Sequence, residues 1–265
     1  MPGNSEGDIP VQAEVPGLLL EKGGYRARLA QGADDLTAAH LLRARCFRTA
    51  SLDQDQFDEA CLHVLIESRS DGALVGCFRL MLLENGQHLH LSYSSQFYDL
   101  TQLCAFSGRM MELGRFCIDP AVQNADVLRL AWGAVTGLVD QNGVGLLFGC
   151  SSFTGTNPSA FIEAFALLKR RHLAPEAWSP GRKAADTRLF GDLLQDRAVD
   201  QKPDLKLAQA QLPPLLRSYL TMGGWVSDHV VIDVELNTCH VFTGLEVKAV
   251  PRVRKRLLRG VAGSL

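Results

Sequence analysis

Apolar residues along the chain follow two kinds of spacing, one typical of strands and one typical of helices. Short apolar or alternating segments predict strands at residues 25–29, 63–67, 74–83, 109–118 and 144–150. Apolar residues at helical spacing predict helices at residues 34–47, 126–142, 158–172 and 213–222. Segments 230–234 and 240–243 flank a turn and predict a hairpin. This order predicts an α/β fold: a mixed sheet with helices on both faces, extended at the C-terminus by the hairpin and a helix.

The same pattern divides the chain into three parts. Residues 1–24 are acidic and rich in Pro and Gly, without a basic start or an apolar stretch, so we expect a flexible leader and not a signal peptide. Residues 25–245 form the main domain, in which the polar segment 173–207 is interpreted as an insertion. Residues 246–265 form a basic C-terminal helix and tail. Within the main domain, Asn85-Gly86 predicts a tight hairpin.

Composition and charge exclude several classes of function. The chain has 265 residues, 46% of them apolar, and a net charge of -2, which argues against a general nucleic-acid-binding protein. No apolar stretch approaches the roughly 18 residues that a membrane-spanning helix needs, so we expect a cytoplasmic protein. The seven cysteines are scattered, without CxxC or Cys/His spacing. Neither a disulfide framework nor a metal site is therefore expected.

Charged residues inside two predicted core strands mark a candidate site. Residues 111–120 read MELGRFCIDP, in which Glu112 and Arg115 interrupt an apolar strand that stops at Asp-Pro. Arg79 lies alone among apolar residues in the strand 74–83. Charges are rarely buried without partners. The two strands therefore indicate a polar site in or beside the sheet.

Several blocks of the sequence resemble known acyltransferases. Three are similar to the autoinducer synthases: Arg45-Cys46-Phe47 followed by Asp53, Asp55 and Asp58; VGCFRL at 75–80; and ELGRF at 112–116. Three downstream blocks resemble more closely the lyso-ornithine-lipid-forming N-acyltransferases of the GNAT superfamily: DVLRLAW at 126–132, GCSSF at 149–153, and PPLLRSYLTMGGWVSDH at 213–229. In order, these blocks cover roughly residues 25–260. The resemblance implies a GNAT-like acyltransferase fold.

The resemblance also implies a reaction. It is the transfer of a 3-hydroxyacyl chain from acyl carrier protein to the α-amine of L-ornithine, which forms lyso-ornithine lipid in the first step of ornithine lipid biosynthesis. Three alternatives stay open: the same reaction on glutamine, an acyl-homoserine-lactone-type autoinducer synthase, and a non-catalytic module that binds acyl carrier protein or a membrane. The implied partners are acyl carrier protein and the amino acid acceptor.

The segment before the second long helix bears on the acyl donor. CoA-dependent relatives carry a glycine-rich loop here, whose backbone N–H groups hold a pyrophosphate. In this chain residues 119–126 read DPAVQNAD and contain no glycine. The 4′-phosphopantetheine arm of acyl carrier protein has one phosphate and no nucleotide. The sequence therefore favours a carrier-protein donor over CoA, with no cofactor bound by the enzyme itself.

Acyl transfer to an amine needs a base, donors for the developing oxyanion and a means of positioning both substrates. Glu112 is the candidate base, because partial burial would raise its pKa toward a useful range. The alternative is an internal ion pair of Glu112 with Arg115 or Arg79. Those two arginines could bind the acceptor's α-carboxylate bidentately, or form salt bridges with Asp53, Asp55 or Asp58.

The remaining candidates have more general roles. Asp55 and Asp58, with Arg45, belong to the helix and loop over the acceptor, where the acids could order the loop, bind an ornithine ammonium or cap a helix. Ser151 and Ser152 are candidate donors in the acyl or pantetheine channel. A covalent mechanism at Cys150 is less favoured, because no nucleophile elbow is present.

The C-terminal segment predicts an amphipathic basic helix. Val250, Val253, Leu257 and Val261 recur at helical spacing, and Pro251 suits a first turn. The other side carries the basic residues Arg252, Lys255, Arg256 and Arg259. We expect this side to contact acyl carrier protein or the anionic inner membrane surface, and a solvated helix face is the alternative.

Overall fold

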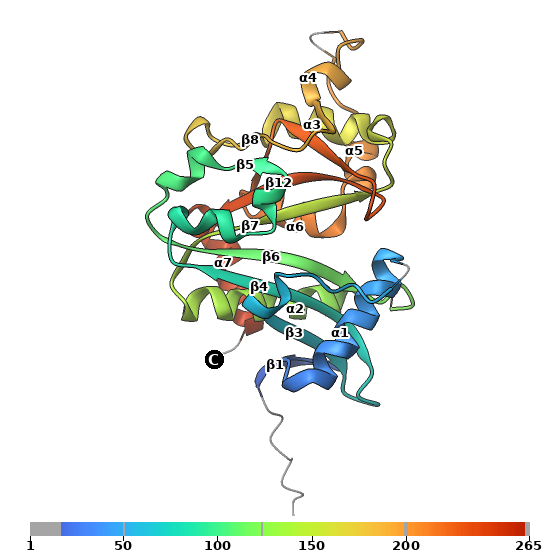
Figure 1. Ribbon diagram of the computed structural model, residues 1–265, viewed down its shortest axis with the longest axis vertical. Helices are drawn as coiled ribbons and strands as arrows, with labels where there is room; N and C mark the ends of the chain where they lie inside the picture. The colour runs from blue at the N-terminus through green and yellow to red at the C-terminus, as the bar shows by residue number, and fades with distance from the viewer. Residues whose placement is uncertain (1–16, 50, 123, 199–200, 263–265) are drawn as a thin grey trace, which may run out of the picture.

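The computed structural model describes residues 17–49, 51–122, 124–198 and 201–262 (Figure 1). The first sixteen residues of the expected leader lie outside the described residues. The structure corrects the prediction for the last part of the leader, because β1 (Leu18–Lys22) pairs antiparallel with β2 (Tyr25–Leu29) and begins the sheet. The ordered domain therefore starts before the predicted boundary at residue 24.

A large mixed sheet runs through the molecule in the order β1-β2-β3-β4-β6-β7-β12-β11-β9, with β10 paired to β12. Its further strands are β3 (Leu62–Ser68), β4 (Leu74–Leu83), β6 (Arg109–Ile118), β7 (Val144–Thr154), β9 (Thr187–Leu189), β10 (Trp225–Val226), β11 (His229–Asp233) and β12 (Thr238–Glu246). Strands β6 and β7 pair in parallel, whereas the other neighbouring strands of the described sheet are antiparallel. The predicted mixed sheet is confirmed.

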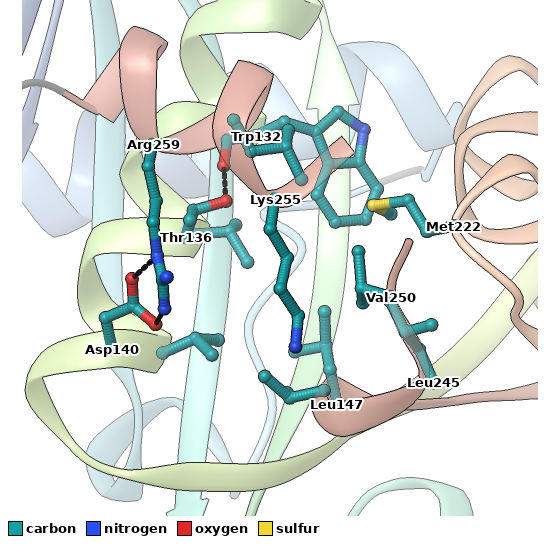
Figure 2. A pocket seen from close by; sticks show the side chains of 13 residues that line it. Trp132, Thr136, Asp140, Leu147, Met222, Leu245, Val250, Lys255 and Arg259 are labelled. Atoms are coloured by element: carbon teal, nitrogen blue, oxygen red, sulfur yellow. Dashed lines mark hydrogen bonds and ion pairs between the residues drawn. The ribbon is translucent and has the colours of Figure 1, made fainter. Parts of the chain in front are cut away.

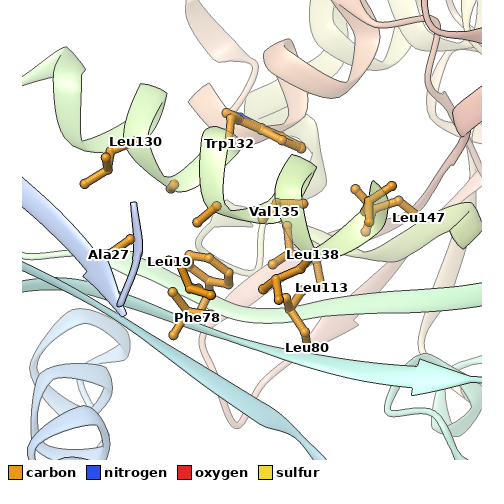
Figure 3. Packing of buried hydrophobic residues seen from close by; sticks show 14 of the residues in the cluster. Leu19, Ala27, Phe78, Leu80, Leu113, Leu130, Trp132, Val135, Leu138 and Leu147 are labelled. Carbon is orange, nitrogen blue, oxygen red and sulfur yellow. The ribbon is translucent and has the colours of Figure 1, made fainter. Parts of the chain in front are cut away.

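Helices cover both faces of this sheet, as predicted. They are α1 (Gly32–Phe47), α2 (Ala125–Gln141), α3 (Ile162–Arg171), α4 (Phe190–Leu193), α5 (Leu205–Gln211), α6 (Pro214–Thr221) and α7 (Arg252–Ala262). Figure 3 shows Trp132, Val135 and Leu138 of α2 packed over Phe78 and Leu80 of β4. Helix α1 packs on the opposite face, because side chains alternate along β3 and β4 and place Leu65 and Cys77 there.

The long connection from β4 to β6 differs from the prediction at Asn85-Gly86. Instead of a tight hairpin, η2 (Gly86–Leu91) begins there, followed by η3 (Ser94–Gln96), β5 (Tyr98–Asp99) and η4 (Thr101–Ala105). Gly86 is required by a close backbone approach, since a Cβ at this position would lie 2.3 Å from the carbonyl oxygen of Leu103. Residues 92–103 thus form a loop with short helical turns.

The polar segment 173–207 contributes to the sheet and to a core. It contains η6 (Glu176–Trp178), β8 (Gly181–Arg182), which pairs with β5, and β9, which pairs with β11. Phe190 is fully buried and stacks on Phe165 of α3. The remaining short elements are η1 (Asp58–Ala60), η5 (Pro158–Phe161) and η7 (Val247–Ala249).

Strands β6 and β7 separate halfway along their length. Their parallel pairing ends at Glu112 and Phe148, although β6 continues to Ile118 and β7 to Thr154. Directly after the last paired residues the two backbones are still close, since a Cβ on Gly149 would lie 2.3 Å from the carbonyl oxygen of Leu113. In β6 a bulge follows, where Arg115 has φ +49°. The separation opens a cleft in the sheet.

Candidate active site

A cavity of about 100 Å³ lies where β6 and β7 separate. One wall, which we call the arginine wall, carries Arg79 of β4 together with Glu112 and Arg115 of β6. The opposite wall, which we call the histidine wall, carries Ser152 of β7, His240 of β12 and Asp233 of β11. The other lining residues are Phe47, Tyr93, Leu113, Gly114, Phe116, Cys150, Leu215 and Leu236. The sheet thus brings together polar residues that are up to 161 positions apart, from Arg79 to His240.

Glu112 is buried, with 4% of its surface exposed, and anchors the loop above the cavity. Its carboxylate accepts hydrogen bonds from the backbone N–H groups of Tyr93 (2.8 Å) and Ser94 (2.7 Å) and from the Ser94 hydroxyl (2.6 Å). Burial raises its pKa above the ordinary value, although these hydrogen bonds act in the opposite direction. The interactions found for the described residues include no ion pair of Glu112 with Arg79 or Arg115, so the internal ion-pair alternative is not supported.

Three arginines and three aspartates form a buried ion network on the arginine wall. Its members are Arg43, Arg79, Arg115, Asp53, Asp55 and Asp58. Arg79 contacts Asp55 (2.5 and 2.9 Å) and Asp58 (2.6 Å). Arg43 contacts Asp58 (2.7 Å) and Asp53 (2.9 Å), and Arg115 contacts Asp53 and Asp55, both at 3.1 Å. Each aspartate therefore bridges two arginines, which is the salt-bridge alternative raised from the sequence.

The network fixes the charge of its acids. Burial alone would raise the pKa of Asp58, but the hydrogen bonds from Arg43 and other neighbours outweigh it and hold the pKa far below the ordinary value. The pKa of Asp55 is lowered in the same way, burial being outweighed by Arg79 and Arg115. Both carboxylates are therefore ionised and occupied by arginine.

The structure does not bring Arg45 to the cavity. Its side chain is 61% exposed and contacts Asp119 at 3.0 Å on the surface. The arginine that reaches the network is Arg43, which sequence reasoning missed. A signal was present, because Arg43 lies four residues after Ala39 and next to Leu42, both on the buried stripe of the helix.

The histidine wall contains polar atoms without partners. The Tyr98 hydroxyl lies 2.9 Å from both the His240 carbonyl oxygen and the His240 Nδ1. Because the carbonyl can only accept, Nδ1 is the donor to Tyr98 and Nε2 is left with a lone pair. Nε2 is buried without a partner among the described residues, and His240 is 2% exposed. Burial, together with nearby His229, lowers the pKa of His240 to about 4, so the ring is neutral at pH 7.

The two candidate serines lie on different faces of β7. Ser152 lines the cavity, whereas Ser151 points to the other face and accepts a hydrogen bond of 2.9 Å from Thr243. Ser151 is thus a structural partner of β12 in this arrangement. Burial raises the pKa of the neighbouring Cys150 thiol to about 12, which disfavours a thiolate nucleophile.

The basic helix α7 packs along α2 (Figure 2). Arg259 contacts Asp140 of α2 at 2.8 and 2.9 Å, and Lys255 points into an apolar pocket beside Trp132. The predicted apolar face is partly wrong: Val253 and Leu257 are 70% and 58% exposed. The side chains packed on the core are Leu258 and Val261. The face of α7 that packs on the domain therefore differs from the apolar face that the spacing of its residues predicted.

No group of His, Cys, Asp and Glu side chains among the described residues has the arrangement of a metal site. No described helix is both long and apolar enough to cross a membrane. All seven cysteines are free thiols.

Comparison with known proteins places the chain in a family. Residues 42–133 match the acetyltransferase (GNAT) domain family. The chain is 30% identical over 242 residues to the L-ornithine N(alpha)-acyltransferase of Rhodobacter capsulatus, in an alignment covering 85% of this chain and 91% of the relative. This chain belongs to the L-ornithine N(alpha)-acyltransferase family. It is an acyltransferase, and the resemblance found in its sequence is confirmed.

The chain is also similar to other proteins. The family member of Brucella abortus is 28% identical over 256 residues, covering 88% of each chain. Among solved structures, an N-acyl amino acid synthase from uncultured soil microbes aligns with a TM-score of 0.48 at 10% identity, covering 84% of this chain and 91% of that one. A CoA-dependent acyl-homoserine lactone synthase aligns with a TM-score of 0.45 at 10% identity, over 87% and 82% of the two chains.

Proposed function

We propose that this enzyme transfers a 3-hydroxyacyl chain from acyl carrier protein to the α-amine of L-ornithine and so forms lyso-ornithine lipid. The observation that carries the proposal is Glu112, a buried carboxylate with a raised pKa that lines the cavity where β6 and β7 separate, in a chain of the ornithine acyltransferase family. A carboxylate whose pKa lies above its ordinary value is a stronger base, which suits the deprotonation of an ammonium acceptor.

In this proposal Glu112 removes a proton from the α-ammonium, directly or through a water. The free amine attacks the thioester carbonyl, the new N–C bond forms, and the C–S bond breaks as the tetrahedral intermediate collapses. The departing thiolate takes the second amine proton. Backbone N–H groups of β6 near residues 116–118 supply donors for the oxyanion, because this segment no longer pairs with β7.

Arg115 is the arginine suited to the acceptor's α-carboxylate. It lines the cavity, its guanidinium lies 4.9 Å from the centre of the Tyr93 ring, and its two contacts to aspartate, both 3.1 Å, are longer than those of Arg79. Arg79 lines the cavity too, but its donors are directed to Asp55 and Asp58. In this proposal Arg79 supports Arg115 by holding Asp55.

The donor assignment rests on the junction before α2. The Asn124 side chain accepts a hydrogen bond from the backbone N–H of Asp126, and the Asp119 side chain accepts one from that of Ala121. Because these backbone donors already have partners, they are not available to hold a pyrophosphate, and acyl-CoA should be the weaker donor. We expect kcat/KM for acyl carrier protein to exceed that for CoA carrying the same chain, and comparable values would contradict the donor assignment.

Purified enzyme, 3-hydroxyacyl carrier protein and single amino acids test the reaction itself. Mass spectrometry should detect the N-acyl product with ornithine. A product with glutamine alone would move the chain to glutamine lipid formation, and an acyl-homoserine lactone would support the autoinducer alternative. Expression in cells followed by lipid extraction gives the same distinction, through a new phosphorus-free lipid that carries ornithine.

The basic face of α7 is proposed to meet acyl carrier protein or an anionic membrane surface. Arg252 and Arg256 are exposed, and Arg259 is held by Asp140. A variant with Gln at positions 252 and 256 should therefore lose salt-sensitive binding to the carrier protein or to anionic vesicles, with little change in Tm. Lys255 is left unchanged because it points into the pocket beside Trp132. The matched control replaces Arg170 and Arg171, which are exposed on α3. Equal binding by both variants would leave α7 as a solvated face.

A further inference from the structure

The cavity contains a carboxylate that the mechanism above does not use. Asp233 ends β11, is buried, and lines the cavity on the histidine wall. One of its oxygens accepts a hydrogen bond of 3.0 Å from the backbone N–H of Leu236. No arginine, lysine or histidine within the described residues forms an ion pair with it.

The other acids at or near the cavity already have hydrogen-bond partners. Asp53, Asp55 and Asp58 are each shared between two arginines of the network. Glu112 accepts three hydrogen bonds from the loop at residues 93–94. An incoming cation would have to displace these partners, whereas at Asp233 it would find a carboxylate without a counter-ion.

The register of β11, β12 and β7 defines the surroundings of Asp233. Asp233 is paired with Thr238, and Val231 with His240, so Thr238 and His240 lie on the same face as Asp233 as its direct and diagonal neighbours. His240 is in turn paired with Ser152 of β7. The Thr238 hydroxyl and His240 Nε2 are both buried without a partner among the described residues. Asp233 therefore lies beside two buried polar atoms that have no hydrogen-bond partner among the described residues.

The negative charge of Asp233 affects other side chains that line the cavity. Burial raises the pKa of the Tyr93 phenol to about 12 and that of the Cys150 thiol to about 12, and the charge of Asp233 adds to both effects. Tyr93 and Cys150 both line the cavity. The electrostatic effect of Asp233 therefore extends to side chains around the space that the acceptor would occupy.

We propose that Asp233 binds the side-chain ammonium of the amino acid acceptor and selects ornithine over neutral amino acids. This inference rests on the proposed function. An ammonium has three N–H donors and no acceptor, and the Asp233 carboxylate and the His240 Nε2 lone pair can both accept from it. Arg115 would bind the α-carboxylate at the opposite wall, so the two charged ends of ornithine meet opposite charges and its α-amine lies between them.

The sharpest test is Asp233→Asn, because its amide oxygen can still accept from Leu236 and only the charge is lost. We measure kcat/KM for ornithine, glutamine and norvaline, which has the ornithine chain without the ammonium, and the binding of free ornithine by calorimetry. The variant should lose on the order of 30-fold or more with ornithine, mainly through KM, and weaken ornithine binding to the same degree. Its activity with norvaline should stay within about threefold.

Glu235→Gln is the matched control, since Glu235 is exposed in the same turn and carries the same charge. It should behave as the wild type with every acceptor. If the wild type prefers ornithine and Asp233→Asn keeps that preference, this inference is wrong and the proposed function stands. If the wild type itself does not prefer ornithine, the proposed acceptor fails, and the role of Asp233 fails with it.

Discussion

The two walls of the cavity differ in how their polar groups are satisfied. On the arginine wall, Arg43, Arg79 and Arg115 alternate with three aspartates, and every aspartate bridges two of them. Arg43 Nε and Asp53 Oδ2 of the network also lack a hydrogen-bond partner among the described residues, but both charged groups stay in ion pairs. On the histidine wall, the buried Thr238 hydroxyl and His240 Nε2 have no hydrogen-bond partner in the described residues, and Asp233 has no ion-pair partner there. A wall whose charges compensate one another can keep its geometry without substrate, whereas the opposite wall becomes satisfied only when a ligand is present.

This difference suits the two walls to different roles. Buried ions are costly unless they are paired, and a pair that loses one partner leaves the other uncompensated. The arginine network therefore acts as a rigid support, and the nearby loop at residues 93–94 is fixed on Glu112. The histidine wall has fewer internal constraints, which suits a surface that distinguishes one acceptor from another.

The largest effect is expected from Glu112, the proposed base. Glu112→Gln should reduce kcat by about 10²–10⁴-fold, the usual contribution of general-base catalysis. Because two N–H groups point at different carboxylate oxygens, the amide –NH₂ would face one of these donors, and the loop should loosen as well. Near-normal turnover over the whole pH range would show that Glu112 only holds the loop.

A control variant separates the base from the support. Ser92→Ala removes a hydroxyl that donates to the Leu89 carbonyl in the same connection without touching Glu112. Thermal unfolding and carrier-protein binding should be similar in the two variants. A comparable loss of turnover in Ser92→Ala would indicate that loop order, and not proton transfer, limits the reaction.

The second effect concerns the stability of the arginine wall. Asp58→Asn leaves Arg43 and Arg79 with less compensating charge in a buried setting, and we expect a loss of about 3–5 kcal/mol in the free energy of unfolding. The control is Asp119→Asn, which breaks the exposed pair with Arg45 and should cost about 1 kcal/mol or less. Equal losses in urea unfolding would contradict the distinction between the network and the surface pair.

Asp58→Asn should also change how the stability of the protein depends on pH. The pKa of Asp58 is lower in the folded state than its ordinary value. Its contribution is therefore present above about pH 4, the unfolded value, and is lost as the pH falls toward the folded pKa. Asp58→Asn should be less stable than the wild type at pH 7, and the difference should shrink as the solution is acidified.

How far sequence reasoning reached depended on whether a signal was local. Strands 74–83 and 109–118 match β4 and β6 at both ends, because each is an apolar stretch, one started by the turn at Gly72 and the other stopped by Asp-Pro. Strand β1 was missed because its five residues follow a Pro- and Gly-rich stretch and gain their partner only in the sheet.

The site shows the same limit more strongly. Glu112, Arg115 and Arg79 were found because charge in an apolar strand is itself a signal. Asp233 and His240 were not among the candidate residues, because their place at the cavity depends on the register of β11, β12 and β7, which local spacing does not encode. For the same reason Asp53, Asp55 and Asp58 could be named from the sequence as possible partners of Arg79 and Arg115, while the part played by Arg43 could not.

The smallest effect is a shift in the pH profile from Ser94→Ala. The Ser94 hydroxyl donates a 2.6 Å hydrogen bond to Glu112 and so favours its ionised form. Its removal should raise the pKa of Glu112 further. A base acts only when deprotonated, so the acid side of the kcat/KM profile should move to higher pH, while the rate at high pH stays within about tenfold of the wild type. Ser95→Ala is the matched control, because the Ser95 hydroxyl donates only to backbone carbonyl groups. A profile unchanged in Ser94→Ala, or equally shifted in Ser95→Ala, would mean that the ionisation limiting the rate is not that of Glu112.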